Sequence, residues 1–172
     1  MPQAKFITKK LLEEVFGQYK EEWLRKYLLP DKRVAVAIVA LDPATPFGSI
    51  DFNPPPLWVG ILGEQDPAKW PEDRYYDKFA YTKALAAWRT RMPNNEMLMN
   101  PELIVNGDFL YEGGIFVAGG WALSVSGLAK APDDTLLAGE FARAVHNEVV
   151  KLFEAAKAKA AVKGAPSSTF YA

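Results

Sequence analysis

The sequence contains no cysteine, which excludes disulfides, thiolate metal sites, iron–sulfur clusters and cysteine nucleophiles. Acidic and basic residues nearly balance, giving a net charge of −1, so the chain lacks the positive field that draws nucleic acid or anionic lipid. No stretch approaches the roughly 18 apolar residues that span a bilayer, and the N-terminus lacks the apolar core of a signal peptide. From these absences we expect a cytoplasmic protein with no nucleic-acid or membrane partner.

The sequence also lacks the common signatures of catalysis. It contains no nucleophile elbow, phosphate loop, HExxH or GxGxxG motif. His146 is the only histidine, and hence the only imidazole that can ligate heme iron or act as a base near neutral pH. The alternative is a partly exposed helix residue, because Val149 and Val150 stand where a second helix-borne metal ligand would lie.

What the sequence does have is apolar periodicity, which predicts three helices. Apolar residues recur every three or four positions over residues 8–28, with Thr8 as the N-cap. A second helical face runs over residues 71–93, with a proline suited to the first helical position. The longest helix is predicted over residues 132–161.

Two segments between these helices predict strands, and a third segment is loop-like. Residues 34–41 are all Val, Ala, Ile or Leu, so both faces must be covered, as in a central strand. Residues 57–62 are the next strand candidate. Residues 92–109 have the character of a loop, although Asn106-Gly107 is also a two-residue hairpin signal.

A glycine-rich segment, YEGGIFVAGGWALSVSGL at residues 111–128, predicts a hairpin. Residues 115–118 and 121–126 fit two antiparallel strands, joined by Gly119-Gly120, a pair that tolerates the positive φ angles of a tight turn. In the second strand Trp, Leu and Val alternate with Ala and Ser, so one face is large and apolar and the other is small. A small face lets a helix, a partner subunit or a flat ligand come close.

The order helix, strand, strand, helix, hairpin, helix predicts the α+β class, with helices packed on one antiparallel sheet. We expect residues 1–162 to form a single domain. Residues 163–172 are expected to be a flexible or partner-docked tail.

The chain resembles a known family, the GlcG and HbpS group of heme-binding-like proteins, which includes the C-terminal domain of PduO. The resemblance covers roughly residues 10–157 and is carried by the order and spacing of several motifs. These are Gly113-Gly114-Ile115, Gly119-Gly120, Ser124-Val125-Ser126-Gly127, Pro132-Asp133-Asp134, the strand at Val34 to Asp42 and Ala80-Tyr81-Thr82. Two departures bear on a pocket: Phe79 stands where the family commonly has lysine, and residues 52–71 are expanded with prolines and tryptophans.

The resemblance implies a profilin-like sheet with helices on it, and assembly into dimers or larger oligomers. In some members it implies binding of heme or a corrinoid-related ligand. It implies no well-established general catalytic activity, so the fold transfers better than the function.

The residues themselves suggest several candidates for binding a small molecule. Arg89 and Arg91 end the second helix, where they either favour the helix dipole or hold a carboxylate such as a heme propionate or a small organic acid. Gly113 and Gly114 follow Glu112, so their backbone amides either face a ligand or simply form a bulge or turn.

Other candidates concern iron and protons. Met97 and Met99 are candidate axial ligands to heme beside His146, although methionine more often fills gaps in a core or interface. Tyrosine is a further candidate, as phenolate or as packing, at Tyr75, Tyr76, Tyr81 and Tyr111. Asp133 and Asp134 are interpreted as helix-start residues rather than a catalytic pair.

Three hypotheses follow. The first is a small-molecule-binding accessory protein of bacterial type, homo-oligomeric, with heme as one candidate ligand and no firm cofactor or metal. The second is an enzyme acting on a small organic acid or carbonyl compound, in which Glu112, Tyr81 or His146 moves protons. The third is a purely structural assembly module.

Overall fold

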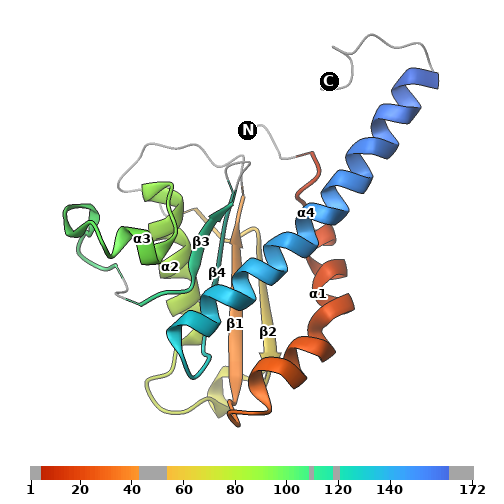
Figure 1. Ribbon diagram of the computed structural model, residues 1–172. Coiled ribbons are helices and arrows are strands. Elements are labelled where there is room, and N and C mark those ends of the chain that lie inside the picture. The colour runs from red at the N-terminus through yellow and green to blue at the C-terminus, as the bar shows by residue number, and fades with distance from the viewer. Residues whose placement is uncertain (1–4, 43–53, 109–110, 118–120, 163–172) are drawn as a thin grey trace.

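The computed structural model describes residues 5–42, 54–108, 111–117 and 121–162. Within these ranges four strands form one antiparallel sheet in the order β2-β1-β4-β3 (Figure 1). The strands are β1 (Ala35–Leu41), β2 (Trp58–Gly63), β3 (Gly114–Val117) and β4 (Trp121–Ser126). This architecture confirms the predicted α+β class. Gly119-Gly120 lies outside the described residues.

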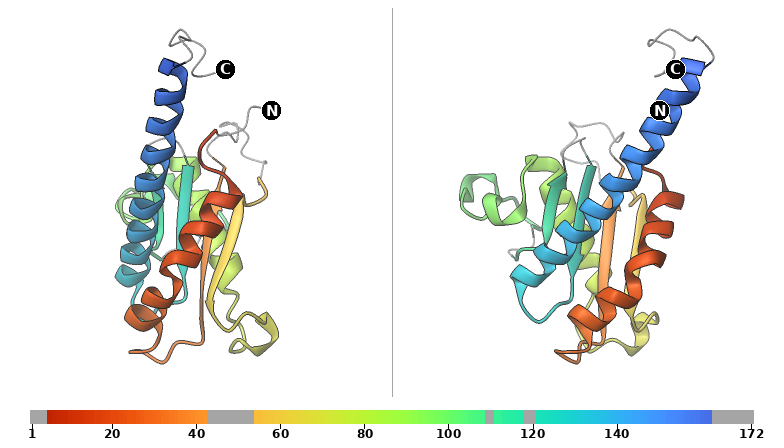
Figure 2. Two further views of the ribbon diagram at one scale, coloured as in Figure 1. Left: turned by 90° about the vertical axis from the view of Figure 1, so that its right-hand side faces the viewer. Right: turned by 45° about the vertical axis from the view of Figure 1, so that its right-hand side comes forward.

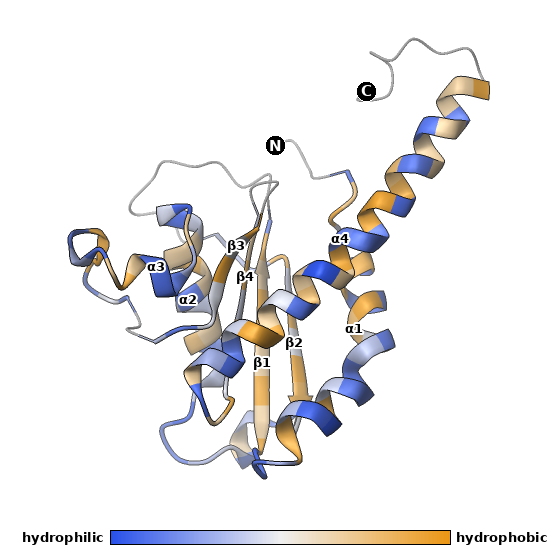
Figure 3. Ribbon diagram, viewed as in Figure 1, coloured by the Kyte–Doolittle hydropathy of each residue, from blue (hydrophilic) through white to orange (hydrophobic). Residues whose placement is uncertain are grey.

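Both faces of the sheet are covered by helices, as the edge-on view in Figure 2 shows. Helices α1 (Lys9–Trp23) and α4 (Ala131–Val162) lie on one face, and α2 (Tyr76–Thr90) lies on the other. Along β1, Val36 and Ile38 join the core under α1 and α4, while Ala37 and Val39 join the core under α2. The central position predicted for this strand is therefore confirmed, and Figure 3 shows its apolar character.

The helix at the N-terminal end of the described chain starts where the sequence predicts. The Thr8 hydroxyl accepts a hydrogen bond from the backbone N–H of Leu11 at 3.2 Å, which satisfies one of the free donors of the first turn. Helix α1 continues into a π-helical segment, Leu24–Leu28. Together the two elements span the predicted residues 8–28.

The predicted start of the second helix is wrong by five residues. Residues 71–74 form a turn instead, in which the backbone N–H of Arg74 donates to the Pro71 carbonyl at 3.0 Å. Asp73 takes a left-handed φ of 63° there, which a helix cannot continue through. Helix α2 therefore begins at Tyr76 and ends at Thr90, followed by Arg91, whose left-handed φ of 59° terminates the helix.

The segment after α2 is more regular than the loop predicted for it. It contains a short helix, α3 (Asn94–Met97), and a 3₁₀ turn over Pro101–Leu103. Asn106 and Gly107 lie in a turn closed by a hydrogen bond from Asp108 N–H to the Val105 carbonyl. No strand flanks that turn in the described residues, so the hairpin signal predicts the turn but not the hairpin.

Helix α4 has 32 residues and runs well past the edge of the sheet in Figure 1. It confirms the predicted longest helix. No helix among the described residues combines the length and the apolar character needed to cross a membrane.

Candidate functional site

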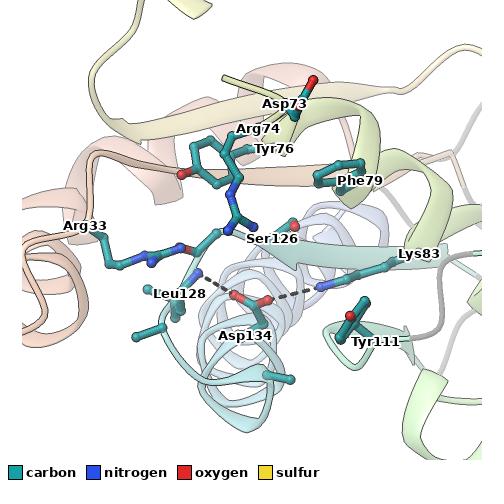
Figure 4. Close-up of a pocket in the computed structure, with 13 residues that line it drawn as sticks. Arg33, Asp73, Arg74, Tyr76, Phe79, Lys83, Tyr111, Ser126, Leu128 and Asp134 are labelled. Atoms are coloured by element: carbon teal, nitrogen blue, oxygen red, sulfur yellow. Dashed lines mark hydrogen bonds and ion pairs between the residues drawn. The ribbon is translucent and has the colours of Figure 1, made fainter. Parts of the chain in front are cut away.

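A pocket of about 530 Å³ lies at the end of the sheet where β4 passes into α4. The turn before α2 and the face of α2 form one side, and residues 126–129 with Ala131 form the other. This volume is within the range of about 300–1,000 Å³ that is typical of small-molecule sites. Figure 4 shows that charged side chains from three separate parts of the chain converge on it.

The centre of the pocket holds a buried ion pair. Lys83 Nζ lies 3.0 Å from Asp134 Oδ2, and the Lys83 and Asp134 side chains are only 2% and 6% exposed. Lys83 Nζ also donates to the Val125 carbonyl at 3.2 Å, and Asp134 Oδ1 accepts from the backbone N–H of Leu128 at 3.0 Å. The pair therefore ties α2 to β4 and to the start of α4.

Burial perturbs both partners of this pair. Desolvation lowers the pKa of Lys83, against the opposing attraction of Asp134 and of Glu112. Desolvation likewise raises the pKa of Asp134, against the stabilisation of its charge by Lys83 and by the Leu128 N–H. The proton of the Lys83 ammonium is consequently easier to remove than that of an exposed lysine, and Asp134 accepts a proton more readily than an exposed aspartate.

Gly113 and Gly114 are required by this arrangement. Gly113 has φ +128°, and a Cβ there would lie 2.9 Å from Lys83 Nζ and 2.5 Å from the Val125 carbonyl oxygen. A Cβ on Gly114 would overlap the amide oxygen of Asn94. The two glycines therefore allow β3 to approach the ion pair, which is a packing role beside the site.

Two arginines bring further positive charge to the pocket. Arg33 Nε donates to the Gly127 carbonyl at 2.7 Å, which places its guanidinium at the β4 end. The Arg74 guanidinium makes no hydrogen bond or ion pair with the described residues, and Figure 4 shows it reaching in above Ser126. Since Lys83 and Asp134 neutralise each other, two guanidiniums face one further carboxylate, the exposed Asp73.

The pocket also has an aromatic wall, formed by Tyr76, Phe79 and Tyr111. Phe79 and Tyr111 stand on either side of the Lys83 side chain in Figure 4. The ring of Tyr76 packs against the ring of Trp70, with the ring centroids 5.2 Å apart. Of the two departures noted in the sequence, Phe79 lines the pocket, and the 52–71 segment contacts its wall through Trp70.

The arginines predicted to hold a ligand lie outside the pocket. Arg89 donates to the Leu103 carbonyl and forms an ion pair with Asp108. Arg91 lies with its guanidinium carbon 5.8 Å from the centre of the Trp88 ring. These contacts give Arg89 a structural role in holding the segment after α2.

The predicted proton carriers do not converge either. The Tyr81 hydroxyl donates to the Pro54 carbonyl at 2.6 Å, and burial raises the pKa of Tyr81. Glu112 is partly buried and acts on Lys83 through its charge. His146 is exposed on α4, twelve residues from Asp134, which corresponds to about 18 Å along a helix.

The predicted heme ligands are also separated. Met97 is fully buried in α3 and Met99 is 81% exposed; neither lines the pocket. The described residues contain no cluster of three or more His, Asp or Glu side chains that would hold a metal ion. Of the heme-ligand types considered from the sequence, only the tyrosines Tyr76 and Tyr111 line the pocket, so the donor set does not fit a heme held by His146 or methionine.

Sequence reasoning missed the two central residues. Lys83 falls on the buried stripe of α2 with Tyr76, Ala80 and Ala87, and a lysine at such a position was the available signal. Asp134 does lie in the first turn of its helix, but its carboxylate points to Lys83 and Leu128. Its interpretation as a helix-start residue was therefore incomplete.

No protein-family model and no curated protein sequence matches the chain. Among solved structures, HbpS is 19% identical, with 84% of this chain and 91% of that chain covered at a TM-score of 0.53. A double mutant of HbpS from Streptomyces reticuli is 20% identical, with 84% and 88% covered and a TM-score of 0.53. Ybr137w is 17% identical, with 85% and 82% covered and a TM-score of 0.58. The resemblance inferred from the sequence is thus confirmed at the level of the fold, and the chain has an HbpS-like α+β fold.

Proposed function

We propose that the pocket binds a small organic anion that carries a carboxylate and an apolar or aromatic body. The observation that carries this proposal is the Arg74 guanidinium, which reaches into the pocket without a partner among the described residues. Guanidinium groups bind carboxylates through charge-assisted, bidentate hydrogen bonds. The aromatic wall supplies the apolar surface that such sites use for the rest of a ligand.

Phenyllactate is a suitable first probe, because it pairs a carboxylate with one aromatic ring. We expect calorimetric titration to give saturable binding, and Arg74→Ala to weaken it about 10- to 100-fold, as expected for a lost charged hydrogen bond. Arg143→Ala removes an exposed arginine from α4 and serves as the matched control with unchanged binding. Equal affinity in the two variants would contradict the proposal.

Heme is the second candidate ligand, favoured by the fold similarity to HbpS. Its propionates would meet the same guanidiniums, whereas His146, Met97 and Met99 lie elsewhere. A hemin titration separates the alternatives. One sharp Soret band per chain that Tyr111→Phe abolishes would favour heme in the pocket, and one that His146→Ala abolishes would favour heme on the surface of α4. A broad band that never saturates in any variant would exclude heme.

We further propose that the protein is an accessory binding protein that forms a homo-oligomer. Helix α4 presents apolar side chains such as Val150 and Leu152 to solvent, and exposed apolar patches are commonly association surfaces. Light scattering tests this directly, since a monomer at all concentrations would contradict it.

A further inference from the structure

We propose that Lys83 forms a covalent imine with the carbonyl group of a 2-oxo acid bound in the pocket, with Asp134 carrying the proton. The inference rests on the proposed anion-binding function and names its ligand class. It uses the carbonyl as the second recognition element, next to the carboxylate held by Arg74.

The position of Lys83 suits this chemistry. Its side chain is almost fully buried, yet it lines the pocket and ends beside a carboxylate. Buried, desolvated lysines serve as nucleophiles in imine formation, because burial favours the neutral amine, which is the reactive form. The lowered pKa of Lys83, which burial causes, increases the fraction of that neutral amine.

The contacts of Asp134 suit a proton carrier. Oδ2 faces Lys83 Nζ at 3.0 Å, within the range required of a general base. Oδ1 is held by the Leu128 N–H, so the carboxylate keeps its orientation when the lysine changes charge. Burial raises the pKa of Asp134 and so favours its protonated form as an intermediate.

The reaction balances without an added oxidant or reductant. The Lys83 ammonium passes a proton to Asp134, and the neutral amine attacks the carbonyl carbon to form a carbinolamine after a proton moves from nitrogen to oxygen. Asp134 then returns its proton to the carbinolamine hydroxyl, which leaves as water. The product is an iminium ion on Lys83 beside the ionised Asp134, so the net charge of the pair is unchanged.

The surroundings of the amine favour a 2-oxo acid over a simple aldehyde. Arg33 and Arg74 line the same pocket as Lys83, and a carboxylate adjacent to the carbonyl would place both groups of one small molecule against both kinds of cation. Phe79 and Tyr111, which flank Lys83 in Figure 4, would cover the side chain of a larger member such as phenylpyruvate.

The test uses phenylpyruvate with borohydride, which reduces an imine to a stable secondary amine, followed by peptide mapping by mass spectrometry. We expect one reduced adduct on Lys83, formed at least tenfold faster than on Lys78. Lys78 lies on the same helix but is exposed, so it reports the background reaction within the same molecule. Phenyllactate, which lacks the carbonyl, should compete with the labelling.

Two variants keep the test informative. Lys83→Arg retains the positive charge facing Asp134 and should abolish labelling of this peptide. Asp134→Asn keeps an acceptor for Leu128 and should slow labelling at least tenfold. Folding of each variant is checked by circular dichroism.

The outcomes separate the two proposals. Saturable labelling of Lys83 that phenyllactate suppresses supports the imine. Binding of phenyllactate without preferential labelling of Lys83 overturns the imine and leaves the anion-binding function in place. Absence of both binding and labelling overturns both.

Discussion

The two faces of the sheet are packed with side chains of different size. Under α1 and α4 the core is built from large rings: Phe141 stacks on Trp58 at 5.4 Å and meets Trp23 edge-on at 5.4 Å. Under α2 it is built mainly from alanines, including Ala80, Ala84 and Ala87. Strand β4 contributes to both cores: Trp121, Leu123 and Val125 join the first, and Ala122 joins the second.

The difference separates the aromatic packing of one face from the buried polar groups of the other. Large rings bury most apolar area and dominate core energetics. Small residues let a helix approach the sheet closely, and on this side the chain buries polar groups: Lys83, Asn94 and Ser124. Asn94 Oδ1 and Ser124 Oγ have no hydrogen-bond partner among the described residues. Such polar groups cost free energy, which the opposite face must offset.

The largest effect is expected from the aromatic face. Phe141→Ala should lower the free energy of unfolding by about 3–5 kcal/mol, because it removes a fully buried ring and leaves a cavity between two tryptophans. Leu136→Ala, on the exposed side of the same helix, is the control and should change stability by about 0.5 kcal/mol or less. Urea denaturation measures both. Similar losses in the two variants would show that the aromatic face is not the main source of stability.

On the α2 side of the sheet, stability should depend on the buried ion pair. Lys83→Met should cost about 3 kcal/mol at pH 7, because it leaves the buried Asp134 carboxylate without its partner. Adding Asp134→Asn removes that unpaired charge and keeps an acceptor for the Leu128 N–H, so the double variant should regain at least half of the loss. Urea denaturation of the two proteins checks this. A double variant no more stable than the single one would show that the loss of stability comes from altered packing and not from the unpaired charge.

Much of this architecture follows from the sequence, because it depends on periodicity. The alternation of large and small residues in β4 predicts two unlike faces, and the continuous apolar run of β1 predicts cover on both. The start of α2 cannot be predicted from the sequence, because a proline such as Pro71 suits the first position of a helix and a turn equally well. The left-handed φ of Asp73, which only the structure shows, identifies this segment as a turn.

The site follows less well, because it is assembled from residues distant in sequence. Lys83 and Asp134 are 51 positions apart, and neither belongs to a motif. Arg89 resembles a ligand-binding arginine in sequence, but its pairing with Asp108 depends on the turn at Gly107. A lysine within a buried helical stripe is therefore a better sequence signal for this site than arginines at a helix end.

The smallest effect is expected at the rim of the aromatic face, where Tyr27 donates to Glu140 Oε1 at 2.7 Å and Lys26 pairs with the same carboxylate. Tyr27→Phe should cost about 1 kcal/mol at pH 7, the typical value of one hydrogen bond. Burial, followed by the bond to Glu140, raises the pKa of Tyr27 from 10.0 to about 12.

This shift predicts a pH dependence whose sign is fixed. Because the pKa of Tyr27 is raised in the folded state, its contribution is complete below pH 10 and is lost as the pH rises through about 12. The stability difference between wild type and Tyr27→Phe should therefore shrink over that window, measured by urea denaturation at a series of pH values. Tyrosines and lysines that contact neither Tyr27 nor Glu140 titrate in both proteins and cancel in the difference. A difference that stays constant to pH 12 would mean that burial at the rim and the bond to Glu140 do not raise the pKa of Tyr27 in the folded protein.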